Sequence, residues 1–206
     1  GAAGVELALA LAPQVSELTL ISSGEILVGH PPGLRARAIR CLVKAEVKLI
    51  EGAAVETVNG DALLCGSQIV WRGKRLILAT GAAPLPWLKE GALAQDKRGF
   101  VAITPTFQSV SHKQILAVGD CASLPDCPRN GVYAVRQGPL LAKNLAAALE
   151  GQQLINFVPQ RHALALLADG KGGALMSWAG VTAEGHLFGW WKDRLDQNFI
   201  NKLTII

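Results

Sequence analysis

The sequence predicts an α/β fold, and three observations point to it. Short apolar segments typical of buried strands alternate with a segment whose apolar residues recur at helical spacing. A series of antiparallel hairpin signals follows them. Half of the 206 residues are hydrophobic and only 17% are charged, which is enough apolar material for one large or two small domains with a core.

The first 81 residues are expected to alternate helices with short strands and then to continue as antiparallel strands. The expected strands are residues 17–21, 47–50, 55–58, 62–65, 69–71 and 76–79. One helix precedes the first strand, and a second follows it with Leu34, Ala38 and Leu42 on one face. Asn59-Gly60 is the expected turn of a hairpin, because this dipeptide suits the twist of paired strands.

A segment with two prolines, residues 82–89, marks a boundary. Beyond it, the expected elements are two strands and a long helix, at residues 100–103, 115–118 and 131–150. Residues 115–118 are wholly apolar, which predicts a buried strand. Gly151 is the expected cap at the carboxyl end of the helix.

The C-terminal segment predicts a hairpin and a closing helix. Residues 163–167 and 174–178 flank a glycine-rich turn. Trp191, Leu195 and Phe199 then recur every fourth residue, as on one face of an amphipathic helix. The expected domains are therefore residues 1–81, 82–150 and 151–206.

Composition argues against several classes of function. The basic residues are scattered, so a nucleic-acid surface is not expected. Neither a membrane-spanning stretch nor a secretion signal is visible, and we expect a cytoplasmic protein. The cysteines do not have the C-x-x-C spacing of redox or metal-binding motifs, so we expect free thiols. A redox pair of Cys121 and Cys127 is the alternative. The four histidines are dispersed, so no metal site is predicted.

The glycines at the start are spaced like the last two of a dinucleotide fingerprint, whose strand and first glycine would precede residue 1. Gly1 and Gly4 either let backbone approach a pyrophosphate or simply begin a helix. In such a unit an acidic residue about 20 positions on binds the ribose. Here Ser22 stands at that place, so NADH and NADPH both remain open as coenzymes.

A carboxylate follows the apolar run 115–118. Ligands of open α/β sheets bind at the carboxyl ends of strands, where Gly119 would allow close approach and Asp120 could accept hydrogen bonds from sugar hydroxyls. The helix beginning near Gly131 would direct free N–H groups and a positive dipole end toward the same place. The alternative for Asp120 is a turn or capping carboxylate.

Three ordered motifs resemble a known family. Residues 1–6, 78–84 and 116–122 are similar to the pyridine-nucleotide-dependent flavoproteins, which include FAD-containing NADH dehydrogenase subunits and disulfide reductases. Residues 131–139 and 191–196 most resemble the oxidoreductase module joined to selenide, water dikinase. Only the C-terminal portion of such an enzyme is matched, since a second glycine-rich strand-turn-helix is not seen.

The resemblance implies a Rossmann-like NAD(P) domain, the C-terminal part of an FAD domain, and a small α+β domain that closes over the flavin. It implies hydride transfer from nicotinamide to FAD, with Asp120 holding the ribityl or pyrophosphate region and backbone at residues 131–133 facing the flavin. No catalytic side chain is assigned. The expected cofactor-binding residues are Gly1, Gly4, Glu6, Ser22, Thr80, Gly81, Gly119, Asp120, Gly131, Val132 and Tyr133.

The expected partners follow from the same resemblance. The acceptor could be a quinone, a selenium or sulfur compound, or a protein, and a fused or neighbouring selenide, water dikinase is possible. The missing N-terminal half would be needed for FAD binding, so we expect this portion alone to be inactive and able to self-associate. Trp178, Trp190 and Trp191 belong either to a packed core, which we favour, or to a channel for the electron acceptor. The last helix could also be weakly attracted to the cytoplasmic face of a membrane. A nucleotide sensor without turnover is the alternative function.

Overall fold

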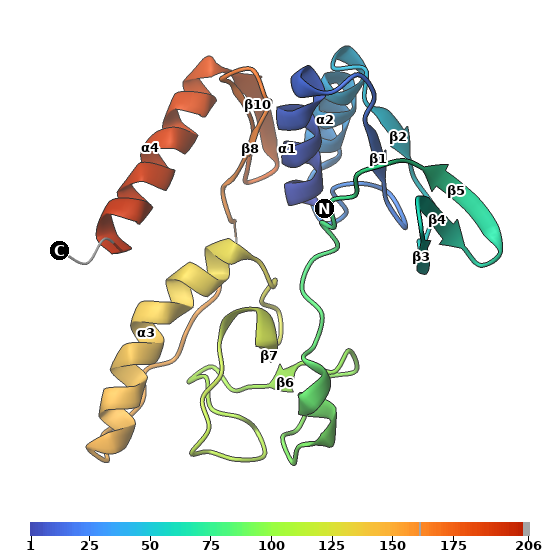
Figure 1. Cartoon of the computed structure of the whole chain (residues 1–206). Helices are drawn as coiled ribbons and strands as arrows, with labels where there is room; N and C mark the ends of the chain where they lie inside the picture. Colours follow the sequence, from blue (N-terminus) through green and yellow to red (C-terminus); the bar gives the residue numbers. More distant parts are fainter. Residues whose placement is uncertain (161, 204–206) are drawn as a thin grey trace. The chain divides into compact units, whose positions relative to one another are not determined.

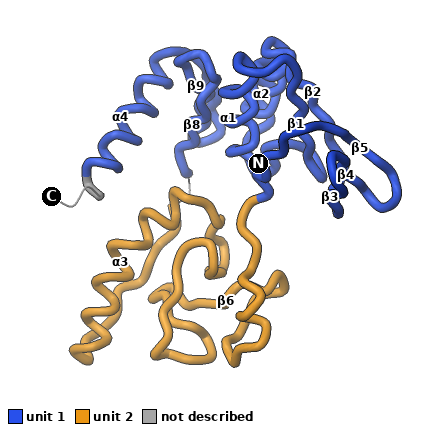
Figure 2. Tube along the Cα trace, viewed as in Figure 1, with its two compact units in different colours: residues 1–80, 162–206 blue, residues 81–161 orange. Residues whose placement is uncertain are grey.

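The computed structural model describes residues 1–160 and 162–203, and they form two compact units (Figures 1 and 2). Unit 1 joins residues 1–80 to the segment that starts at His162, and unit 2 is the stretch of chain between them. The first break, after Thr80, lies one residue before the expected boundary. The C-terminal segment shares a core with unit 1, so it is not a separate compact body here.

The described residues of unit 1 form three α-helices and three small sheets. The helices are α1 (Ala2–Leu11), α2 (Pro32–Lys44) and α4 (His186–Leu203), with the 3-10 turn η1 (Ala12–Gln14) after α1. Strands β1 (Thr19–Ile21) and β2 (Lys48–Ile50) are parallel. The other two sheets are antiparallel: β3 (Thr57–Asn59), β4 (Ala62–Cys65) and β5 (Gln68–Arg72), and β8 (Ala165–Ala168), β9 (Ala174–Trp178) and β10 (Val181–Gly185).

The core of unit 1 brings the two ends of the chain together. Leu34, Ala38 and Leu42 of α2 are buried, which confirms the predicted face of that helix. They share one apolar cluster with Leu167 of β8 and Leu175 of β9. Burial of a leucine side chain contributes about 1.5–3 kcal/mol, so this shared cluster accounts for the C-terminal sheet packing on the N-terminal helices.

Two predictions in unit 1 need correction. Asn59 pairs with Ala62, so the hairpin turn is Gly60-Asp61, and Gly60 supplies the positive φ of +58°. Residues 76–79 do not form a strand, and Leu78 is 71% exposed. No described strand pairs with them, and an apolar segment without a neighbouring strand cannot form the backbone hydrogen bonds of a sheet.

Unit 2 contains one long helix and a single short sheet of two strands among its described residues. Its elements are η2 (Pro86–Glu90), β6 (Val101–Ala102), η3 (Gly119–Cys121), β7 (Ala122–Ser123) and α3 (Gly131–Leu149), with β6 and β7 parallel. Gly151 follows α3 at φ +67° and its N–H donates to Ala148, which confirms the predicted cap. Residues 115–118 are not the predicted buried strand, since they are exposed or half-buried and only Leu116 makes an isolated bridge.

The core of unit 2 is aromatic at its centre and polar on one side. Phe107 is fully buried and its ring centroid lies 5.5 Å from that of Phe157. Asn144 of α3 is also fully buried, and its amide donates to the carbonyls of Thr106 and Ile155 at 3.1 and 2.9 Å. Its oxygen accepts the Ile155 N–H at 2.9 Å. These three bonds fasten α3 to two loops that have no sheet of their own.

The closing helix does not bury its aromatic residues. Trp190 and Trp191 of α4 are 60% and 39% exposed, and Trp178 at the end of β9 is 56% exposed, so the preferred assignment of the three residues to a packed core is wrong for this structure. Leu195 and Phe199 are also exposed, because only part of α4 rests on β8 and β9. No described helix has the length and apolar content needed to cross a membrane.

Candidate functional site

The Gly119-Asp120 turn places a carboxylate on the surface of unit 2. Gly119 has φ +71°, a conformation that glycine adopts without strain, and Asp120 is exposed. The side-chain oxygen of Gln137 in α3 accepts the Gly119 N–H at 2.8 Å. Gln137 is 5% exposed, so this bond fixes the turn against the helix from the inside. Sequence reasoning missed Gln137, because a single glutamine in a helix carries no motif.

The N-terminus of α3 lies beside this turn. Asn130 caps the helix by accepting the Tyr133 N–H at 3.2 Å. Tyr133 is 3% exposed, and its hydroxyl donates to the carbonyl of Gln160 at 3.2 Å. Gly131 and Val132 are exposed. The structure therefore gives Tyr133 a packing role and leaves the N–H groups of Gly131 and Val132 as the donors at this helix end.

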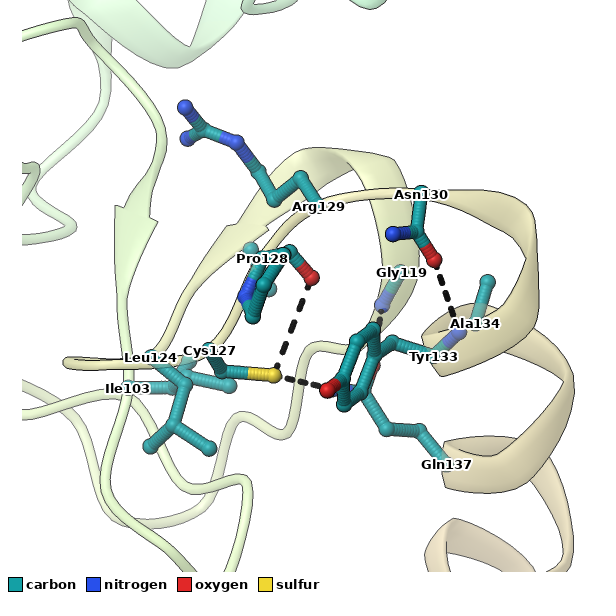
Figure 3. Close-up of a pocket in the computed structure, with 11 residues that line it drawn as sticks. Ile103, Gly119, Leu124, Cys127, Pro128, Arg129, Asn130, Tyr133, Ala134 and Gln137 are labelled. Carbon is teal, nitrogen blue, oxygen red and sulfur yellow. Dashed lines mark hydrogen bonds between the residues drawn. The ribbon is translucent and has the colours of Figure 1, made fainter. Parts of the chain in front are cut away.

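A small cavity lies between the turn and the helix (Figure 3). Gly119, Cys127, Tyr133 and Gln137 are among the residues that line it. Its volume is about 10 Å³, which is about the size needed for one water molecule. No coenzyme fits inside, so a ligand of unit 2 would lie over the exposed side of the Gly119-Asp120 turn.

The segment before α3 is held by a half-buried arginine. The Arg129 guanidinium lies 3.5 Å from the ring centroid of Phe100 and 3.4 Å from a carboxylate oxygen of Asp96. Burial alone would raise the pKa of Asp96, but hydrogen bonds from the Phe100 N–H, Ser123 and the Arg98 N–H, together with Arg129, lower it. The network keeps Asp96 ionised and orients the chain that enters the cap of α3.

In unit 1, the predicted fingerprint residues stand at the start of α1. Gly1 is the N-cap of α1, and Gly4 is buried where an added Cβ would lie 3.5 Å from Leu20 and 3.6 Å from Ala79. Glu6 accepts the Ala168 N–H at 2.8 Å and lies 3.6 Å from the ammonium of Lys192. The start of α1 offers N–H donors to an anion, whereas Glu6 already has protein partners.

A cavity of about 570 Å³ lies beside the segment that joins β1 to α2. The Ser22 N–H bonds the Ile50 carbonyl at 2.9 Å, so Ser22 and Glu51 stand side by side where the two parallel strands end. Residues 25–30 and the first turns of α2 line the cavity, His30 and Arg35 among them. Volumes of 300–1,000 Å³ are usual for small-molecule sites.

The arginines of α2 are engaged. Arg35 donates to Glu51 at 2.6 Å. Arg37 and Arg40 both lie 3.1 Å from the Glu184 carboxylate on β10. Arg37 and Arg40 therefore bind the C-terminal sheet to α2.

A profile of the pyridine nucleotide-disulphide oxidoreductase family matches residues 1–143, which is 143 of the 206 residues. The chain belongs to this family. A curated relative, the NADH dehydrogenase-like protein YutJ of Bacillus subtilis (strain 168), is 25% identical over 171 residues, covering 78% of this chain and 45% of YutJ. The internal alternative NAD(P)H-ubiquinone oxidoreductase A1 of Arabidopsis thaliana mitochondria is 28% identical over 131 residues, 61% of this chain and 26% of that protein.

Solved structures show the same fold. The sulfide:quinone oxidoreductase of Aquifex aeolicus superposes with a TM-score of 0.73 at 18% identity, covering 96% of this chain and 54% of that one. An FAD-dependent pyridine nucleotide-disulphide oxidoreductase from Desulfovibrio vulgaris gives 0.63 at 21% identity, covering 84% and 46%. The fold is thus the α/β fold of the flavoprotein disulfide reductases, and this chain spans less than half the length of the curated relatives it matches.

The residues present fit the two coenzymes of this family. In unit 2, a glycine with positive φ, an exposed carboxylate and the free N–H groups at the start of α3 form one polar surface. In unit 1, the start of α1 offers free N–H groups, and Ser22 follows the last residue of β1 at the carboxyl ends of the two parallel strands. Thr80 and Gly81 are both exposed at the division between the units, and no contact among the described residues tests their expected role.

The described residues contain no group of three or more side chains suited to holding a metal ion. Cys121 and Cys127 are both free thiols, and the Cys121 thiol donates to the Val118 carbonyl. Burial raises the pKa of Cys127, which favours the unreactive protonated form at neutral pH.

Proposed function

We propose that this chain forms the NAD(P)H site and the C-terminal part of the FAD site of an FAD-dependent NAD(P)H oxidoreductase. The observation that carries the proposal is the surface formed by Gly119, Asp120 and the first N–H groups of α3, in a chain of this family. Asp120 would accept hydrogen bonds from sugar hydroxyls of FAD, and Gly131 and Val132 would donate to its electron-rich edge. When bound, FAD supplies the ability to take a hydride from nicotinamide.

The residues of unit 1 would bind the reductant. The start of α1 at Gly1 and Gly4 would donate to the pyrophosphate, and Ser22 would bond a ribose hydroxyl. These assignments are supported by the position of the three residues at the edge where α/β sheets bind nucleotides.

The acceptor is proposed at the level of chemical class. One relative is named for ubiquinone and one similar structure for sulfide and quinone, which supports a quinone or a sulfur compound. A selenium compound, and association with selenide, water dikinase, are supported only by the resemblance of residues 131–139 and 191–196.

Rapid mixing of the full-length protein with NADH tests the proposal. Loss of the yellow absorbance of oxidised flavin within the first turnover supports hydride transfer. An unchanged spectrum, with coenzyme binding still measurable by calorimetry, would instead favour a nucleotide sensor without turnover.

A further inference from the structure

We propose that Glu51, by holding Arg35 at the carboxyl edge of β1 and β2, makes the unit 1 site select NADH over NADPH. This inference rests on the proposed binding of a nicotinamide coenzyme to unit 1. The two coenzymes differ only in a phosphate on the adenosine ribose. The place of that ribose is the end of β1, where the acid usual in such units is replaced by Ser22.

Glu51 occupies the same edge from the neighbouring strand. It follows the last residue of β2, and the Ser22 N–H bonds the carbonyl just before it. Its carboxylate accepts the Ile26 N–H and the Arg35 guanidinium, each at 2.6 Å. The hydrogen bond from Ile26 is the main reason that the pKa of Glu51 is lowered, so this acid is ionised at neutral pH.

Arg35 lines the cavity, and it is already paired. Its guanidinium lies 2.6 Å from Glu51 and 3.8 Å from Glu25, and its Nε is buried without a partner where no ligand reaches it. A phosphate that drew the Arg35 guanidinium toward itself would weaken its bond to Glu51. Loss of that bond would leave a carboxylate that is 26% exposed without its counter-ion.

The other arginines of α2 and His30 do not offer a free positive charge to a phosphate. Arg37 and Arg40 are paired with Glu184 of β10. His30 lines the cavity, but burial lowers its pKa, so its ring is neutral at neutral pH.

The charges around the cavity therefore add up to a barrier. Glu25 and Arg35 line the cavity, and Glu51 is bonded to Arg35 and to the Ile26 N–H behind it; the three side chains carry two negative charges and one positive charge, which gives a net charge of −1. A ribose 2′-phosphate approaching this group is repelled, whereas the 2′-hydroxyl of NADH meets only hydrogen-bonding groups. We expect the chain to bind the unphosphorylated coenzyme at least about tenfold more tightly.

Calorimetric titration of the full-length protein with NAD⁺ and NADP⁺ tests this without turnover. Glu51→Gln keeps an oxygen for the Ile26 N–H and releases Arg35, so the preference should shrink by about tenfold. Glu25→Gln, at a side chain that is 69% exposed, cannot threaten folding and should shrink it by about twofold to threefold. Glu184→Gln is the matched control: it frees Arg37 and Arg40 instead, and the preference should not change.

Three results would overturn the inference. Equal or tighter binding of NADP⁺ by the unaltered protein refutes the selectivity. An unchanged preference in both Glu51→Gln and Glu25→Gln refutes the role of these acids, and a gain of NADP⁺ binding in Glu184→Gln assigns the phosphate to the other arginines. Binding of neither coenzyme has a different meaning, because it refutes the proposed function of unit 1 and removes the basis of the inference with it.

Discussion

Replacing Gln137 with leucine should weaken both the fold and the FAD site. Gln137 is 5% exposed and its oxygen is the acceptor, at 2.8 Å, for the N–H of Gly119. Leucine fills a similar volume but accepts no hydrogen bond, so the N–H of the half-buried Gly119 would lose its partner. A buried donor left unsatisfied costs about 1–3 kcal/mol. The second contact of Gln137, with the Cys127 sulfur at 3.8 Å, is weak and adds little.

We therefore expect Gln137→Leu to lower the free energy of unfolding by about 2 kcal/mol. Urea denaturation of the full-length protein measures this change. Because the bond also sets the position of Asp120, the purified variant should carry less FAD than the unaltered protein. Lys143→Leu, at an exposed position of the same helix, is the control and should change neither quantity. A change of unfolding free energy below about 0.5 kcal/mol, with FAD content unaltered, would refute the role of Gln137.

Three further perturbations test the packing and the charges. Asn144→Ala removes three buried hydrogen bonds and should lower the free energy of unfolding by about 3 kcal/mol or more in urea; a loss below about 1 kcal/mol would contradict this. The lowered pKa of Asp96 adds stability that is present above about pH 4 and is lost as the pH falls further. In Asp96→Asn the free energy of unfolding should therefore fall less between neutral pH and acidic pH than in the unaltered protein. Asp193→Asn is the control and should leave this pH dependence unchanged. Gly170→Ala would press a Cβ against the carbonyl of Leu9 and should unfold unit 1 at lower temperature than Gly180→Ala, which has a similar positive φ but open space around it; equal melting temperatures would contradict the packing of the C-terminal sheet on α1.

Helices and antiparallel hairpins were predictable because their signals are local. The buried face of α2 follows from four-residue spacing, and the cap at Gly151 follows from the need for a residue with positive φ. The strands predicted at 76–79 and 115–118 failed because an apolar run becomes a strand only when another strand pairs with it. Whether such a partner strand is present depends on the tertiary structure, which cannot be read from the local sequence.

The site was predictable in part. The exposure of Asp120 and the positive φ of Gly119 agree with a ligand-facing turn, and the motif alone pointed to these residues. Gln137 and Glu51 were missed because they bond groups that are distant in the sequence: Gln137 accepts the Gly119 N–H, and Glu51 accepts the Ile26 N–H and the Arg35 guanidinium. The pairing of Arg37 with Glu184 was missed for the same reason, since the two residues lie 147 positions apart in the sequence.

The exposed aromatic residues of α4 show a second limit of sequence reasoning. Trp190 and Trp191 were assigned to a core because large aromatic side chains usually supply core area. In the structure both are exposed, and the Arg194 guanidinium lies 5.8 Å from the Trp190 ring centroid. Periodicity identifies an apolar face, but it does not say what covers that face.

The affinity of the full-length protein for FAD, compared between the unaltered chain and Asp120→Ala, tests the central claim most directly. A hydrogen bond to a charged group contributes about 1.5–3 kcal/mol, so the variant should bind FAD at least about tenfold more weakly. Glu150→Ala, an exposed acid at the other end of α3, should bind FAD as the unaltered protein does. Full retention of stoichiometric FAD by Asp120→Ala, at unchanged affinity, would contradict the assignment of this turn to the flavin coenzyme.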